Sequence, residues 1–192
     1  MSWNVTVACL RWTVPSMLTT GSVSVPLRYW RRHGRWWSTF IRVVPAAVMS
    51  SDFEELLKLL NENSVKYLVV GGHAVMLYTE PRYTKDLDLW IDASEENAGK
   101  VFRSLAAFGA PLAGLSPEDF SRDGFFYQIG RPPARIDILM SIDGVRFEDA
   151  WGGRNQSDLG AQRVWFISRA DLVRNKRACG RHIDLHDLDL IE

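Results

Sequence analysis

The segment DLDLWI, residues 86–91, alternates acidic and apolar residues, and this alternation constrains the fold more than any other feature of the chain. Side chains two residues apart on a β-strand point to the same face. Asp86 and Asp88 therefore share one face, while Leu87 and Leu89 point the other way into a core. Two carboxylates this close repel each other unless a cation lies between them. The pattern predicts a half-buried strand that carries two acidic groups into one site.

A glycine pair, Gly71 and Gly72, follows the apolar run at residues 65–70 directly. The run predicts a buried strand, and residues 72–78 have helical character. Glycine lets the backbone N–H groups at the start of a helix approach an anion closely. The pair is thus a candidate phosphate seat. Under the alternative interpretation, the glycines form only a turn, and Asp86 and Asp88 face solvent from an edge strand.

A third carboxylate, Asp137, lies in the apolar segment ARIDIL between Ile136 and Ile138. A buried carboxylate without a partner is costly, and joining a metal cluster would relieve that cost. Mg²⁺ prefers carboxylate oxygens and keeps open positions for phosphate. Asp137 with Asp86 and Asp88 would give three carboxylates from two strands. Beside a glycine turn, that set outlines a two-metal site for phosphoryl or nucleotidyl transfer.

The other segments interleave predicted helices and strands. Helices are expected over residues 53–63, 95–108, 168–177 and 183–191, and strands at FFYQIG, ARIDILM and RVWFIS. Ser168 and Asp171 form a plausible capping pair for the third of these helices. In the last helix we expect inward positions at Ile183, Leu185, Leu188 and Ile191. This order predicts an α+β fold in which a small mixed β-sheet is flanked by helices.

Residues 1–48 differ in composition from the rest of the chain. They contain six arginines and five of the eight tryptophans but no Asp, Glu or Lys, which gives +6 against −6 for residues 49–192. The segment could be a transit peptide, a basic patch for nucleic acid or a membrane surface, or upstream sequence read through before a true start at Met49. We favour the last explanation. We therefore expect a disordered or mis-assigned head, 1–48, and a single domain, 49–192.

Cellular context is constrained by two further observations. No apolar run reaches the ~18 residues of a membrane-spanning helix, so we expect no membrane partner. The two cysteines, Cys9 and Cys179, have neither metal-ligand nor redox spacing. A reducing compartment, and hence a cytoplasmic location, is the simplest expectation.

Taken together, the motifs resemble a known family. The pair GG, then DLD after thirteen intervening residues, then RIDIL looks like the signature of the DNA polymerase beta-like nucleotidyltransferase superfamily. The segments RYTKDLD and KRACGRHIDLHDL are similar to the AbiEii-like group, often described as toxins of type IV toxin–antitoxin systems. The resemblance covers about residues 56–191. It implies the polymerase beta-like fold and transfer of a nucleoside monophosphate from an NTP to a hydroxyl on tRNA, protein or a small molecule, with a cognate antitoxin as a further partner.

The resemblance implies roles for the matching residues. Asp86 and Asp88 would bind two Mg²⁺ ions, and Asp137 would complete one metal site and help deprotonate the attacking hydroxyl. Gly71 and Gly72 would seat the triphosphate. The remaining nucleotide-binding positions would be Arg82, Thr84 and Lys176, with Arg and Lys contacting phosphate.

Several interpretations stay open beside these roles. Asp184 and Asp187, which with Arg181 match the end of the segment KRACGRHIDLHDL, hereafter the late motif, could equally be helix-capping and surface residues. His73 stands where the superfamily more often has Ser, and a core-facing histidine is the commoner case. His182 and His186, four residues apart, could hold zinc. An inactive nucleotide- or partner-binding relative remains an alternative, and so does a glycosyltransferase, although the latter explains neither the glycine pair nor Asp137.

Overall fold

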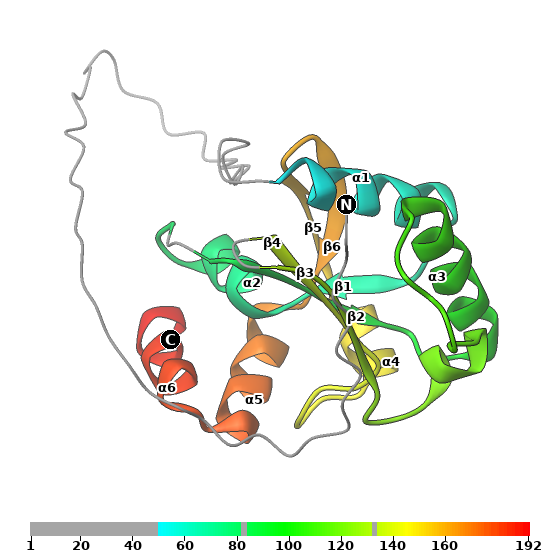
Figure 1. Ribbon diagram of the computed structural model, residues 1–192. Coiled ribbons are helices and arrows are strands. Elements are labelled where there is room, and N and C mark those ends of the chain that lie inside the picture. Colours follow the sequence, from blue (N-terminus) through cyan, green and yellow to red (C-terminus); the bar gives the residue numbers. More distant parts are fainter. Residues whose placement is uncertain (1–49, 82–83, 132–133) are drawn as a thin grey trace, which may run out of the picture. The chain divides into compact units, whose positions relative to one another are not determined.

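The computed structural model describes residues 50–81, 84–131 and 134–192. The head expected at 1–48 and the predicted phosphate contact Arg82 lie outside these residues. The described body is an α+β unit built on one mixed sheet (Figure 1). Within the described ranges, no helix is long and apolar enough to cross a membrane.

The sheet has six strands in the order β3-β4-β2-β1-β6-β5. Strand β2 lies near its middle, antiparallel to β1 and parallel to β4, while β3 with β4 and β5 with β6 form antiparallel pairs. The strands are β1 (Tyr67–Val69), β2 (Asp86–Ile91), β3 (Phe126–Arg131), β4 (Ala134–Leu139), β5 (Asn155–Leu159) and β6 (Gln162–Phe166).

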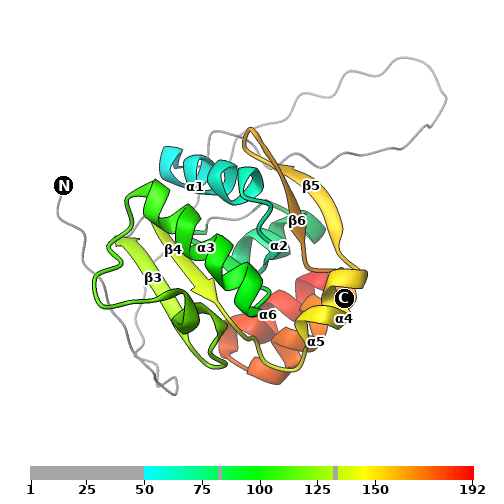
Figure 2. The ribbon, with the colours of Figure 1, turned by 90° about the vertical axis from the view of Figure 1, so that its right-hand side faces the viewer.

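Helices cover both faces of this sheet. Helices α1 (Ser51–Glu62) and α3 (Glu95–Phe108) pack together on one face. A 3₁₀ helix, η2 (Pro117–Ser121), comes after α3 in the chain and packs against it. The opposite face carries α2 (Gly71–Tyr78), α5 (Arg169–Cys179) and α6 (His182–Ile191) (Figures 1 and 2). A short helix, α4 (Phe147–Gly152), packs the Phe147 ring edge-on against Trp90 at 5.0 Å.

Local sequence explains where the main helices begin. The Ser50 hydroxyl accepts a hydrogen bond from the Asp52 N–H at 3.2 Å, and it caps α1. The predicted capping pair of α5 is confirmed, because the Asp171 N–H donates to the Ser168 hydroxyl at 3.1 Å. Such caps satisfy N–H groups that have no partner inside the helix, at about 1 kcal/mol each. They fix the residues at which α1 and α5 begin.

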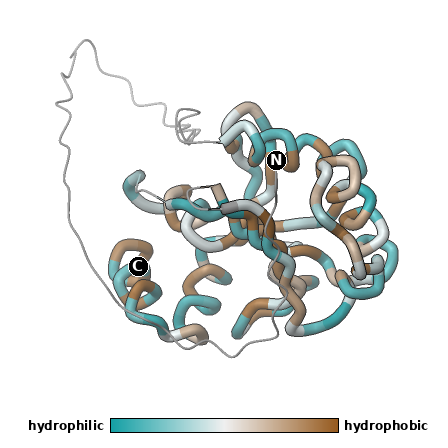
Figure 3. The backbone as a smooth tube through the Cα atoms, viewed as in Figure 1, coloured by the Kyte–Doolittle hydropathy of each residue, from teal (hydrophilic) through white to brown (hydrophobic). Residues whose placement is uncertain are grey.

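The core lies mainly between the sheet and helices α1 and α3. Leu87 and Leu89 are fully buried, as the alternation in β2 predicts. Hydrophobic residues run along the strands that cross the middle of the body (Figure 3). Burial of each such leucine stabilises the fold by about 1.5–3 kcal/mol. This packing holds β2 in one register, since a shift by one residue would turn both aspartates into the core.

The predicted inward face of the last helix is partly wrong. Leu188 and Ile191 are buried in α6, but Ile183 is 55% exposed and Leu185 is 51% exposed. Asp184 and Asp187 take the inward positions instead, at 0% and 1% exposure. They can do so because an ion pair with a buried lysine of α5 compensates for the lost hydration, as described below.

Candidate functional site

The three predicted carboxylates come from two neighbouring parallel strands. In the β2–β4 pairing, Asp88 lies opposite Asp137 and Asp86 lies opposite Arg135. Partners in such a pairing point to the same face, and so do residues two apart. Asp86, Asp88, Asp137 and Arg135 therefore share the face that carries α2, α5 and α6. The three aspartates thus point to the same face of the sheet, as the alternation of residues in the two strands predicts.

The glycine pair brings the start of α2 into direct contact with this face. Gly71 has a φ of 58°, and a Cβ placed on it would lie 2.0 Å from Asp88 Oδ2. A Cβ on Gly72 would lie 2.5 Å from the Thr84 hydroxyl oxygen. Glycine alone adopts this conformation without strain and leaves room for both side chains. Asp88 and Thr84 thus lie against the first turn of α2.

The beginning of α2 also has the features of an anion seat. Its N-cap residue is Val70, which provides no side-chain cap, and its first turn contains no acidic residue. Backbone N–H groups at a helix start carry partial positive charge and bind phosphate readily. The Val70 N–H itself donates to the backbone oxygen of Asp88 at 3.0 Å, which ties the helix start to β2.

Arg135 holds two of the carboxylates together. Its Nη2 lies 2.6 Å from Asp86 Oδ2 and 3.3 Å from Asp137 Oδ2. The Gln128 side-chain amide donates to the other oxygen of Asp137 at 2.8 Å. Neither Arg135 nor Gln128 was a candidate on sequence grounds. The available signal was the strand period, because Arg135 precedes Asp137 by two residues and so had to share its face.

Charge repulsion and burial act together on the cluster. Burial, followed by the charges of Asp137 and Asp86, raises the pKa of Asp88 to about 7, although Arg135 and Arg181 oppose this shift. Burial also raises the pKa of Asp137, against the hydrogen bond from Gln128 and the charge of Arg135. Both burial and the neighbouring carboxylates disfavour the charged form of these groups, which Arg135 compensates only in part. An added cation would stabilise the charged forms.

The donor set fits a divalent cation, but the side chains are not arranged around one. Among the residues that the structure describes, no three His, Cys, Asp or Glu side chains form a ready-made metal site. The Arg135 guanidinium lies between Asp86 and Asp137, so a metal held by both would require Arg135 to turn away. His182 and His186 are exposed on α6 and, in the same residue set, join no group of three donors.

The late motif folds into a buried ionic cluster. Lys176 Nζ lies 2.9 Å from Asp184 Oδ1 and 2.8 Å from Asp187 Oδ2, and Lys176 is only 4% exposed. The surface-charge interpretation of Asp184 and Asp187 is therefore wrong. Asp184 does serve as a cap, because it accepts the backbone N–H of Arg181 at 3.3 Å at the start of α6. Because the Lys176 side chain is only 5% exposed, a phosphate could reach its ammonium only if the cluster opened.

His73 is buried in α2 and packs edge-on against Phe53 of α1, with ring centroids 6.3 Å apart, as expected of a core-facing histidine.

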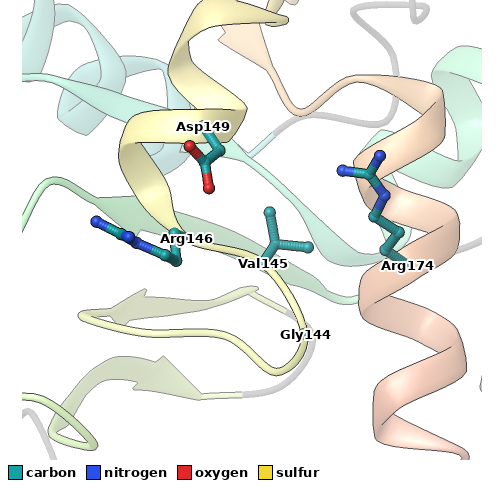
Figure 4. Close-up of a pocket in the computed structure, with 5 residues that line it drawn as sticks. All are labelled: Gly144, Val145, Arg146, Asp149 and Arg174. Carbon is teal, nitrogen blue, oxygen red and sulfur yellow. The ribbon is translucent and has the colours of Figure 1, made fainter.

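An open hollow between the loop before α4, α4 itself and α5 contains none of the predicted site residues (Figure 4). Its lining residues are Gly144, Val145, Arg146, Asp149 and Arg174.

Solved structures with a similar fold include two nucleotidyltransferases, of which only the second below reaches a TM-score of 0.50. The lincosamide antibiotic adenylyltransferase LnuA, in its lincomycin-bound form, is 16% identical over 76% of this chain and 99% of its own, with a TM-score of 0.45. A candidate nucleotidyltransferase from Thermotoga maritima is 15% identical over 71% of this chain and 88% of its own, with a TM-score of 0.50. No protein-family model and no curated protein matches the sequence. The body has the nucleotidyltransferase, polymerase beta-like fold that the motifs predicted.

Proposed function

We propose that this protein transfers a nucleoside monophosphate from an NTP to a hydroxyl acceptor. The observation that carries the proposal is the convergence of Asp86, Asp88 and Asp137 on one face, against a helix start that only glycine at position 71 permits. The carboxylates supply metal ligands, and the helix start supplies a seat for phosphate. Nucleotidyl transfer requires these two elements side by side.

Asp86, Asp88 and Asp137 would hold two Mg²⁺ ions. When bound, Mg²⁺ neutralises charge on the triphosphate and on the transferring phosphoryl group. The raised pKa of Asp88 and Asp137, caused first by burial and then by neighbouring carboxylates, supports this assignment, because a bound cation would stabilise their charged forms. Arg135 would leave its position between Asp86 and Asp137 and remain nearby as a cation for the same cluster.

The chain's own groups can perform the remaining steps. The acceptor hydroxyl oxygen forms a bond to the α-phosphorus while the bond to pyrophosphate breaks. Asp137 accepts the hydroxyl proton, and its raised pKa makes it a better base than an ordinary aspartate. N–H groups at Gly71 and Gly72 donate to phosphate oxygens. Thr84, whose hydroxyl donates to the Asp86 backbone oxygen at 3.5 Å, lies beside that seat.

The acceptor class is a further part of the proposal. The resemblance to the AbiEii-like group favours a toxin-type enzyme that acts on tRNA, protein or a small molecule and is countered by an antitoxin. The body carries a net charge of −6, so tRNA binding would need basic residues beyond its average composition. A panel of acceptors is therefore the appropriate assay.

A second candidate is a non-catalytic relative that binds nucleotide or a partner protein. The specific observation in its favour is the position of Arg135, whose guanidinium takes the place between Asp86 and Asp137 where a metal would bind. In that case the same face would bind nucleotide without transferring it.

Incorporation of label from an NTP into an acceptor distinguishes the nucleotidyltransferase from the non-catalytic relative. The purified protein is incubated with each labelled NTP, Mg²⁺ or Mn²⁺, and tRNA, protein or aminoglycoside acceptors. We expect Asp86→Asn and Asp88→Asn to lower transfer at least ~10²-fold, since each removes a charge that holds the metal. Asp123→Asn, at an exposed position outside the cluster, is the matched control. A parent that binds NTP but labels no acceptor would establish the non-catalytic alternative.

A further inference from the structure

Four residues of the late motif form one connected ionic cluster, which we call the α5–α6 cluster: Lys176, Arg181, Asp184 and Asp187. Lys176 pairs with Asp184 and Asp187 at 2.9 and 2.8 Å. Asp184 in turn takes Arg181 in a two-point contact, with Nε 2.5 Å from Oδ2 and Nη2 3.1 Å from Oδ1. Asp184 thus joins a buried ammonium on one side to a guanidinium on the other.

The four side chains differ sharply in exposure. Those of Lys176, Asp184 and Asp187 are 5%, 0% and 1% exposed, whereas that of Arg181 is 41% exposed. Removing an ion pair from water costs about as much as its attraction returns, so burial of this trio adds little to stability. A buried arrangement of this kind is better explained by what it fixes in place. Here it fixes the Arg181 guanidinium.

Arg181 lies where a cation is useful to the proposed reaction. It is the N-cap of α6, which packs against α2 on the face that carries the carboxylates. The two groups lie close enough for the charge of Arg181 to act on the Asp88 carboxyl, where it makes a small contribution that opposes the rise in pKa caused by burial. Asp88 itself touches the start of α2 at Gly71. Arg181 therefore stands near the junction of the predicted metal ligands and the predicted phosphate seat.

We propose that Arg181 contacts the phosphate chain of the bound nucleotide and that Lys176, Asp184 and Asp187 position it. A guanidinium is a rigid fork with five donors, and the contact with Asp184 uses two of them, along one edge. In the nucleotide complex, phosphate oxygens would accept from donors of Arg181 that this contact does not use, in exchange for what those donors contact in the free protein. The inference rests on the proposed function. It assigns the phosphate contact of the late motif to Arg181, in place of Lys176.

Binding measurements test this inference without any need for transfer. Each NTP is titrated calorimetrically into the full chain, and the one that binds is then compared with its diphosphate, monophosphate and nucleoside. We expect Arg181→Ala to weaken NTP binding at least ~10-fold, about 1.4 kcal/mol, since a charge-assisted hydrogen bond to phosphate is lost. The affinity for the nucleoside should stay within about twofold of the parent, and Arg181→Lys should recover part of the loss. Arg177→Ala, which removes an exposed arginine from the same segment, is the matched control.

The positioning role is tested by a double-mutant cycle. Asp184→Asn keeps the shape of the side chain but loosens its grip on Arg181, so it should weaken NTP binding less than Arg181→Ala does. In the Arg181→Ala background it should add almost nothing to the loss in NTP affinity. Thermal unfolding of each variant checks that the fold is kept. If Arg181→Ala does not fold, the NTP affinities of Arg181→Lys and Asp184→Asn are compared with that of the parent, and unchanged affinity in both variants overturns the inference.

The outcomes separate the inference from the proposed function. Unchanged NTP affinity in Arg181→Ala overturns the inference alone, and so does an equal loss for NTP and nucleoside, which would indicate a structural cap. Full additivity in the cycle overturns the positioning role. A parent that binds none of the four NTPs overturns the proposed function, and the inference with it.

Discussion

Gly71 and Asp88 are so close that one methyl group on Gly71 would lie 2.0 Å from the Asp88 carboxylate oxygen. The backbone at Gly71 is also left-handed, with a φ of 58°. The carboxylate and the helix start are adjacent because one side chain is missing. The geometry of the site therefore requires glycine at position 71 as much as it requires the acidic residues.

Gly71→Ala is expected to lower the free energy of unfolding by at least ~1–2 kcal/mol. The left-handed conformation costs that much for a residue with a Cβ, and the displaced Asp88 adds to it. Urea unfolding measures the effect. Gly152→Ala is the control, because a Cβ at Gly152 in α4 meets nothing within 4 Å. Equal effects of the two substitutions would contradict the close packing of α2 on Asp88.

Asp88→Asn should stabilise the metal-free protein, and more so at higher pH. The folded pKa of Asp88 is raised to about 7 from an ordinary value of 3.8. Between these two values the folded state binds more protons than the unfolded state, so the parent loses stability as pH rises. Asparagine does not titrate. Urea unfolding in EDTA should show a gap between variant and parent that grows from pH 4 to pH 7 and then levels off, whereas a constant gap would refute the buried-charge argument.

Arg135→Gln should tighten the binding of Mn²⁺, used as a spectroscopic substitute for Mg²⁺. The guanidinium competes with a metal for Asp86 and Asp137, and glutamine removes that competing charge. Electron paramagnetic resonance of free Mn²⁺ gives the affinity. Arg122→Gln, at an exposed position in the loop after η2, is the control. Weaker Mn²⁺ binding in Arg135→Gln would mean that Arg135 supports the metal site and does not compete with it.

Lys176→Met is expected to cost roughly 3–5 kcal/mol of stability, because it removes the ammonium that pairs with the buried Asp187 and leaves the buried Asp184 with Arg181 alone. Adding Asp184→Asn and Asp187→Asn should return much of that loss, since the uncompensated charges are then gone. Chemical unfolding of the single and triple variants measures both effects. Lys58→Met, on the exposed face of α1, is the control. Failure of the triple variant to recover would show that the cluster stabilises by packing and not by charge.

The acidic positions of the site could be predicted because each has a local signature. Asp86 and Asp88 alternate with leucines that had to enter a core, and Asp137 interrupts an apolar strand. Strand period alone therefore determines their face. The glycine pair marks a sharp change from strand to helix. These signals involve neighbouring residues only, so no knowledge of the strand pairing was required.

The features that sequence could not predict depend on distant partners. Arg135 pairs with Asp86 only because the β2–β4 register places the two residues opposite each other, although they are 49 residues apart in the sequence. Hydropathy placed Ile183 and Leu185 inward in α6 because it could not foresee that Lys176 would neutralise Asp184 and Asp187. Strand β5 is polar and half-exposed, so it lacks an apolar signature, and α4 is only six residues long.

The parallel β2–β4 register also limits how sequences with this design can vary in length. Inserting or deleting one residue inside either strand would exchange its two faces, which moves carboxylates into the core and leucines or isoleucines toward the nucleotide. Away from the three aspartates, single substitutions at residues 86–91 and 134–139 can be accommodated by the fold, but changes in the number of residues cannot. Insertions and deletions should therefore accumulate in the connections, such as residues 109–116 and 141–146, while both strands keep a constant length.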